Sequence, residues 1–259
     1  MILLNGFVTC IIVGVSAGII GTGIGGAFAF ILRQPSQRIL SMLMGFSSGL
    51  MLSVVCFDLL PTAFEIGSLS SGITGIIIGV VLIIICEDII NVQSSHTVVG
   101  QQSSHIIVRQ RDSYMRSGIL VGIGIALHNF PEGLAIGSGL TVAQSYGLGL
   151  SILIAIHDIP EGMAMAIPLV AAGLSSMRVF LYTVLAGVPT GIGAIIGYMI
   201  GDISPMLISV CLGFAGGAMI YITCGEIIPE ASNMHIGRIS SIGTVLGIIA
   251  GILLTNIIN

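Results

Sequence analysis

The sequence predicts an all-α integral membrane protein with eight transmembrane helices. Of its 259 residues, 55% are hydrophobic and only 7% are charged, and the mean hydropathy is +1.13. Soluble domains carry roughly 25% charged residues, so this composition excludes a soluble globular enzyme. It also excludes a disordered chain and a nucleic-acid-binding protein, which needs a basic face. Prolines inside apolar runs and 37 glycines favour helices over the alternating strands of an outer-membrane barrel.

The polar breaks in the chain set the expected helix boundaries. About 20 apolar residues cross a hydrocarbon core of roughly 30 Å. The predicted spans are 2–31, 39–62, 71–91, 117–141, 147–172, 179–201, 205–229 and 239–258. We expect residues 1–259 to form a single transmembrane domain. Its one long connection, about 92–116, is rich in Ser, Gln and Arg and is predicted to be a flexible cytoplasmic loop.

The basic residues predict the orientation of the chain. All seven are arginines, and every one lies on an odd-numbered connection between the predicted spans. The positive-inside rule therefore places the odd connections in the cytoplasm and both termini outside the cell. The alternative is that seven charges cluster in this way by chance. The arginines are Arg33, Arg38, Arg109, Arg111, Arg116, Arg178 and Arg238.

Two copies of one motif place polar groups inside the membrane. The fourth span contains HNFPEG at 128–133 and the fifth contains HDIPEG at 157–162, which share the pattern H-[ND]-x-P-E-G. His128 lies about 18 Å along the helix from Arg116, near the bilayer midplane. Ionisable groups at that depth cost several kcal/mol unless they face a partner or a cavity, so a functional site is the default interpretation. The alternative is a hydrogen-bonded cluster that only joins two helices.

The spacing within each motif predicts a metal site. His128 and Glu132 are four residues apart and share one helix face, as do His157 and Glu161. If the two antiparallel helices face each other, two imidazoles and two carboxylates converge. Such a set suits Zn²⁺ and related divalent ions, and the two glutamate charges neutralise one dication.

The second position of each motif extends this prediction to two metals. Asn129 and Asp158 are three residues from the same glutamates, so each glutamate is able to bridge toward an oxygen-rich second pocket. The prolines of both motifs, Pro131 and Pro160, are predicted to free a backbone carbonyl and to open the helix locally at the midplane. Broken helices at that depth are typical of transporters.

A second internal similarity predicts an inverted repeat. Residues 56–61 (CFDLLP) and 224–229 (CGEIIP) share the pattern C-x-[DE]-x-x-P, and their spans run in opposite directions. Asp58, Glu226 and Glu230 are therefore candidate stepping sites along a permeation path. The alternative is that these acids simply reach water near helix ends. His96 and His105, in the long connection, are candidates for cytoplasmic metal capture, with simple solvation as the alternative.

The paired motifs, their place in the fourth and fifth of eight spans, and the polar loop after the third resemble the ZIP (Zrt/Irt-like protein) family of metal transporters, prokaryotic type. The resemblance implies import of Zn²⁺, and of related ions such as Fe²⁺, Mn²⁺ or Cd²⁺, across the cell (plasma) membrane into the cytoplasm. It also implies a 3+2+3 arrangement of helices, a binuclear midplane site and a homodimer.

The resemblance also assigns roles to residues. The first metal site would be formed by His128, Glu132, His157 and Glu161. Asn129 and Asp158, with the bridging glutamates, would form the second. Many family members add a glutamate from the sixth span, where this chain has Thr190, so the second site is one carboxylate short. The divalent ion is then the substrate, and neither an organic cofactor nor a nucleic-acid partner is expected.

Two other function classes fit the sequence less well. An intramembrane metallohydrolase also uses His and Glu at a buried metal, but it needs an open coordination position and a separate general base. The chain contains no H-E-x-x-H sequence, and the duplicated ligand set leaves no obvious base. A metal-sensing receptor without transport is disfavoured because no large soluble domain accompanies the spans.

Overall fold

A computed structural model describes residues 2–31, 36–95, 106–201 and 203–258. Within these residues, eight helical segments are long and apolar enough to cross a membrane, which confirms the predicted fold class. The elements are α1 (Ile2–Ile31), α2 (Gln37–Val54), η1 (Val55–Leu59), α3 (Leu60–Ile66), α4 (Leu69–Ser95), α5 (Ile106–Val142), α6 (Gln144–Ala171), α7 (Ser176–Gly201), α8 (Pro205–Ile222), η2 (Thr223–Ile227), α9 (Ile228–Met234) and α10 (Ile239–Ile258).

The eight spans divide into an inner and an outer set. The spans built on α2, α5, α6 and α8 are 59–72% buried, whereas those built on α1, α4, α7 and α10 are 28–44% buried. Large apolar side chains are exposed along the outer helices, as expected for surfaces that contact lipid. Polar groups placed on the inner four helices are therefore screened from lipid by the outer four.

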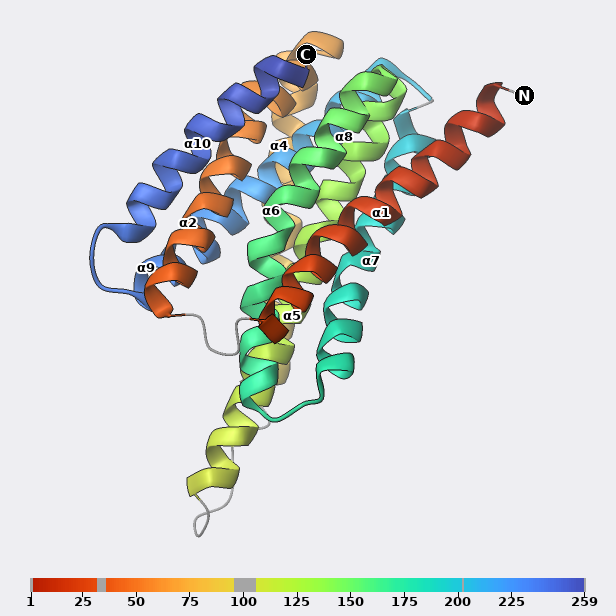
Figure 1. The fold of residues 1–259 in the computed structure, drawn as a ribbon. Helices are drawn as coiled ribbons and strands as arrows, with labels where there is room; N and C mark the ends of the chain where they lie inside the picture. The colour runs from red at the N-terminus through yellow and green to blue at the C-terminus, as the bar shows by residue number, and fades with distance from the viewer. Residues whose placement is uncertain (1, 32–35, 96–105, 202, 259) are drawn as a thin grey trace.

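The helix packing repeats itself about an internal symmetry. Helix α2 packs against α10 as α8 packs against α4, and α6 packs against α1 as α5 packs against α7. Exchanging the first three spans with the last three, and α5 with α6, converts each of these contacts into another of them. The chain ends lie at the same end of the bundle (Figure 1), and α5 and α6 pack against each other. This pattern is that of two inverted repeats around a central helix pair.

Glycines set the closest helix contacts in both repeats. A Cβ atom on Gly49 of α2 would overlap the carbonyl oxygen of Thr244 in α10, and a Cβ atom on Gly217 of α8 would overlap the carbonyl oxygen of Ile76 in α4. Small residues allow this close approach where no hydrophobic force drives helices together in lipid. The matching positions of Gly49 and Gly217 follow the same internal symmetry.

Two wide turns interrupt the inner helices at matching places. The π-helices η1 and η2 coincide with the C-x-[DE]-x-x-P repeats, and their widened turns end with bonds from the N–H groups of Leu60 and Ile228 to the carbonyls of Val55 and Thr223. Each turn precedes a proline whose ring would crowd the carbonyl one turn earlier, and the extra residue of a π-turn relieves that crowding.

The prediction that Pro131 and Pro160 open their helices locally is wrong. Both prolines lie inside the continuous helices α5 and α6. A single proline removes one hydrogen bond, and in a packed bundle the flanking bonds and neighbouring helices maintain the helix. The irregular backbone lies instead in η1 and η2.

The long connection is shorter than expected. Helix α4 continues to Ser95 and α5 begins at Ile106, so helix replaces much of the predicted loop of 92–116. His96 and His105, the candidates for metal capture, lie outside the described residues.

Candidate metal centre

The two motifs meet at the centre of the bundle. His128 and Glu132 lie on α5, and His157 and Glu161 lie on α6. Each histidine is at the middle of its membrane-spanning segment, Tyr114–Val142 or Gln144–Ala171. All four side chains are at least 97% buried. The i,i+4 spacing therefore brings the imidazole and carboxylate groups to one buried place at mid-membrane depth.

Glu132 joins the two histidines. Its Oε1 lies 2.7 Å from Nε2 of His157 and 3.0 Å from Nε2 of His128. Glu161 closes the group from the other helix, with its Oε1 3.5 Å from Nε2 of His128. The donor atoms of His128, Glu132 and His157 all lie within 4.8 Å of one another.

This group has the composition and spacing of a zinc site. Zinc binds histidine nitrogen and carboxylate oxygen at about 2.0–2.2 Å, so the donor atoms around a tetrahedral zinc ion are about 3.4 Å apart. Shifts of under about 1 Å would place the three donors at those distances. Three buried atoms of this group also lack a partner within the described chain, namely Nδ1 of His128, Nδ1 of His157 and Oε2 of Glu132. Such unpaired polar atoms are costly unless a cation binds them.

A second group of polar atoms lies beside the first. Both carboxylate oxygens of Asp158, the amide oxygen of Asn129 and the hydroxyl of Thr190 are buried without hydrogen-bond partners in the described chain. Asp158 Oδ1 lies 3.6 Å from Nε2 of His157. The amide nitrogen of Asn129 donates to the carbonyl of Ala186 at 2.8 Å, which leaves its oxygen available. One carboxylate, that of Asp158, is among these atoms.

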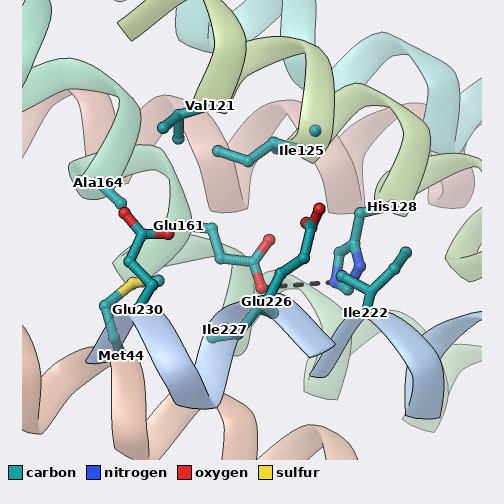
Figure 2. Close-up of a pocket in the computed structure, with 11 residues that line it drawn as sticks. Met44, Val121, Ile125, His128, Glu161, Ala164, Ile222, Glu226, Ile227 and Glu230 are labelled. Atoms are coloured by element: carbon teal, nitrogen blue, oxygen red, sulfur yellow. Dashed lines mark ion pairs between the residues drawn. The ribbon is translucent and has the colours of Figure 1, made fainter. Parts of the chain in front are cut away.

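A cavity leads from the first site toward one end of the bundle. It has a volume of about 330 Å³, and its wall includes His128, Glu161, Glu226 and Glu230. Figure 2 shows the two pathway acids around the same space as the ion pair between His128 and Glu161. The other lining residues lie on the inner helices. Each of them is in the half of its span that is closer to an odd-numbered connection. The cavity therefore joins the site to that end.

The opposite end of the site is closed by packed side chains. Leu150, Leu153 and Ile154 of α6 and Ile136 of α5 are at most 1% exposed and belong to one large apolar cluster. Asp58, the counterpart of Glu226 in the internal repeat, is buried on η1 and interacts electrostatically with Tyr146. Of the predicted pathway acids, Glu226 and Glu230 line the cavity and Asp58 does not.

Ser47 is a supporting residue that the sequence analysis missed. Its hydroxyl donates to the carbonyl of His157 at 2.8 Å, next to the carbonyl of Ile156 that Pro160 cannot bond. This contact connects α2 to the backbone that carries the ligand. A serine in an apolar span was the only available signal, and serines of this kind are common in membrane helices.

Comparison with known proteins identifies the family to which this site belongs. Residues 91–259, which include both motifs, match the family model of the ZIP zinc transporters. The match covers more than half of the chain. The chain belongs to the ZIP zinc transporter family. It is thus a multi-pass protein of the plasma membrane, in a family of transporters and not of enzymes.

Individual relatives agree with the ZIP family model. A zinc transporter ZupT of Corynebacterium efficiens is 32% identical over 128 residues, which is 45% of this chain and 47% of the relative. The ZupT of Streptococcus mutans serotype c is 32% identical over 136 residues, 49% of this chain and 50% of the relative. The ZupT of Escherichia fergusonii is 32% identical over 130 residues, which is 49% of this chain and 48% of the relative. The chain spans about half the length of the curated relatives it matches.

Proposed function

We propose that this chain carries divalent metal ions, Zn²⁺ foremost and also Fe²⁺, Mn²⁺ and Cd²⁺, across the membrane into the cytoplasm through the site on α5 and α6. The proposal rests on one observation above all, the convergence of His128, Glu132 and His157 at mid-membrane depth with donor atoms within 4.8 Å of one another. The names of the ZupT relatives support zinc as the main substrate.

Charge balance favours a dication as the occupant. With both imidazoles neutral, Glu132 and Glu161 supply two negative charges, which one dication neutralises. An isolated carboxylate in a low-dielectric interior costs several kcal/mol, so the unloaded site is expected to be unstable relative to the loaded one. Histidine nitrogen with carboxylate oxygen is a borderline ligand set that suits zinc and neighbouring transition metals better than Mg²⁺ or Ca²⁺.

The one-sided cavity supports a gated path. An ion at the site reaches the end with the odd-numbered connections through a space lined by Glu226 and Glu230, while the packed cluster blocks the other end. Transport requires that a second arrangement opens the other side, because a continuous open pore would leave no barrier. The arginines support assignment of the open end to the cytoplasm, with both termini outside.

Neutralising the two cavity acids is expected to slow transport. Glu226→Gln combined with Glu230→Gln should lower the initial rate of zinc uptake several-fold, because the carboxylates attract the ion between the site and the water. The number of zinc ions bound at equilibrium should stay the same, since neither acid belongs to the buried ligand group. Tracer uptake and calorimetric titration of the same preparation measure the two quantities. An unchanged rate would contradict the pathway role.

We further propose that the first site alone is filled in the wild-type chain. The second pocket has Asp158 as its only carboxylate beyond the shared glutamates, and Thr190 offers a weak hydroxyl ligand. Thr190→Glu is expected to raise the zinc stoichiometry from one to two per chain, measured by calorimetric titration, because it adds the missing charge. Thr190→Val serves as the control and should bind one. Two zinc ions in the wild type would contradict this assignment.

The proposed activity is tested by uptake into liposomes containing the purified protein. Radioactive Zn²⁺ should enter faster than in protein-free liposomes, and unlabelled Zn²⁺ and Cd²⁺ should compete more strongly than Mn²⁺ or Mg²⁺. Equal uptake with and without protein would overturn the proposal. We also propose a homodimer, as the family resemblance implies, which native mass measurement of the same preparation tests.

A further inference from the structure

A second cavity lies on the lipid-facing side of the bundle, away from the metal path. It has a volume of about 380 Å³ and is bounded by α5, α6 and α7. Small residues form its floor, namely Gly122 and Ala126 of α5 and Ala186 of α7, and Ile123 and Leu185 form its exposed edges. We call this space the α5/α7 groove. Its shape and apolar lining suit an acyl chain.

Two arginines stand at one end of the groove. On α5, Arg116 precedes the groove residues Ile119 and Ile123 by three and seven positions, so all three share one helix face. On α7, Arg178 precedes Tyr182 and Leu185 by four and seven positions, with the same result. Both helices begin at the same end of the bundle (Figure 1), and their closest contacts run from Gly133 and Thr190 toward the other end. Both arginine side chains are exposed.

Tyr182 marks the level of the membrane surface. It lines the groove and is 43% exposed, one turn inside Arg178. Tyrosine is enriched where the hydrocarbon core meets the headgroups, and arginine side chains extend from that level toward the phosphates. The groove thus runs from the headgroup level into the hydrocarbon core, with positive charge at its polar end.

We propose that the α5/α7 groove binds one anionic phospholipid, with its phosphate held by Arg116 and Arg178 and an acyl chain in the groove. Basic pockets between transmembrane helices recognise anionic headgroups in this way. The groove also backs onto the metal centre, because the carbonyl of Ala186 accepts the amide of Asn129 at 2.8 Å. A bound chain would therefore support the turn of α7 that holds Asn129.

Native mass spectrometry of the full-length protein in a zwitterionic detergent tests the proposal. Dioleoyl phosphatidylglycerol should remain bound at one molecule per chain and at least ten-fold more tightly than dioleoyl phosphatidylcholine. Glycerol 3-phosphate, which supplies the phosphate without the chains, should not bind measurably. Equal affinity for the two lipids, or binding of glycerol 3-phosphate as tight as that of the anionic lipid, would overturn the proposal.

Variants separate the two halves of the site. Arg116→Gln with Arg178→Gln should weaken phosphatidylglycerol binding about 25-fold, from about five-fold for each arginine. Arg38→Gln with Arg238→Gln makes the same change in net charge. Arg38 lies on α2 and Arg238 lies just before α10, and neither helix lines the groove, so this variant should bind as the wild type does. Full binding by the first pair would contradict the proposal.

Two further variants test the proposal if the variant with Arg116→Gln and Arg178→Gln fails to fold. Arg116→Lys with Arg178→Lys retains the positive charges and should still prefer phosphatidylglycerol. Ala126→Phe fills the groove while leaving both arginines in place, and should lose the lipid. If Ala126→Phe binds the lipid unchanged, the groove does not hold the chain. These readouts report binding and not uptake, so they are independent of the proposed transport.

Discussion

Replacing Glu132 by alanine is expected to abolish zinc uptake. Glu132 lies between the two histidines, 2.7 Å from Nε2 of His157 and 3.0 Å from Nε2 of His128, and no other carboxylate in the described chain contacts both imidazoles. Changes to residues that only support a metal ligand cost about 10–100-fold in affinity. Loss of this ligand should cost at least that much. Tracer uptake into liposomes and calorimetric titration measure the two effects.

Two controls separate loss of the site from loss of the fold. Glu65→Gln removes an exposed carboxylate at the end of α3 and should transport zinc at the wild-type rate. Glu132→Gln keeps the shape of the side chain and should also lose uptake, because the neutral amide no longer balances the dication. Each variant should elute as a single monodisperse species in detergent. Wild-type uptake by Glu132→Ala would exclude it as a ligand of the transported ion.

Adding side chains at the paired glycines is expected to unfold the bundle at lower temperature. Gly49→Val and Gly217→Val each push a branched side chain into the backbone of a neighbouring helix, at Thr244 and Ile76, and a backbone carbonyl is unable to move aside. Overpacking of this kind costs about 1–3 kcal/mol or more per site. The midpoint of thermal unfolding in detergent should fall in each variant, and further in the double variant.

The matched control for these variants is Gly225→Ala. A Cβ atom at Gly225 would meet no atom within 4 Å, so its midpoint should not fall, because alanine is the better helix former. If Gly49→Val and Gly217→Val unfold at the wild-type midpoint, the close helix contacts at these glycines do not hold the bundle together. Similar shifts for the two variants would reflect the internal symmetry of the α2/α10 and α8/α4 contacts.

The spans and the central ligands were predictable because strong physical rules apply to them. Twenty apolar residues with polar breaks define a span without tertiary information, and ionisable groups such as His128 and Glu132 are too costly in lipid to lie there without a function. The i,i+4 spacing fixed the helix face shared by each pair. The predicted metal site needed one further assumption, that α5 and α6 face each other. In the structure the histidines of both helices contact Glu132.

Other features depended on packing between distant segments. Pro131 and Pro61 both lie inside apolar segments, and the sequence does not distinguish them. Pro131 nevertheless lies within a continuous helix, whereas Pro61 follows a π-turn. Their neighbours in the fold decide that outcome. Burial of Asp58 and exposure of Glu226 were also unpredictable, because the two positions are equivalent in the repeat. Only the conformation, open at one end and packed at the other, distinguishes them.

The most direct test is the location of bound zinc. Crystals grown with Zn²⁺ and measured at the zinc absorption edge should give an anomalous peak between α5 and α6, about 2.0–2.2 Å from the nitrogen atoms of His128 and His157 and the carboxylate of Glu132. The account predicts this peak to be the strongest within the bundle. Zinc bound only at Glu226 and Glu230, with the buried histidines and Glu132 free of metal, would contradict it.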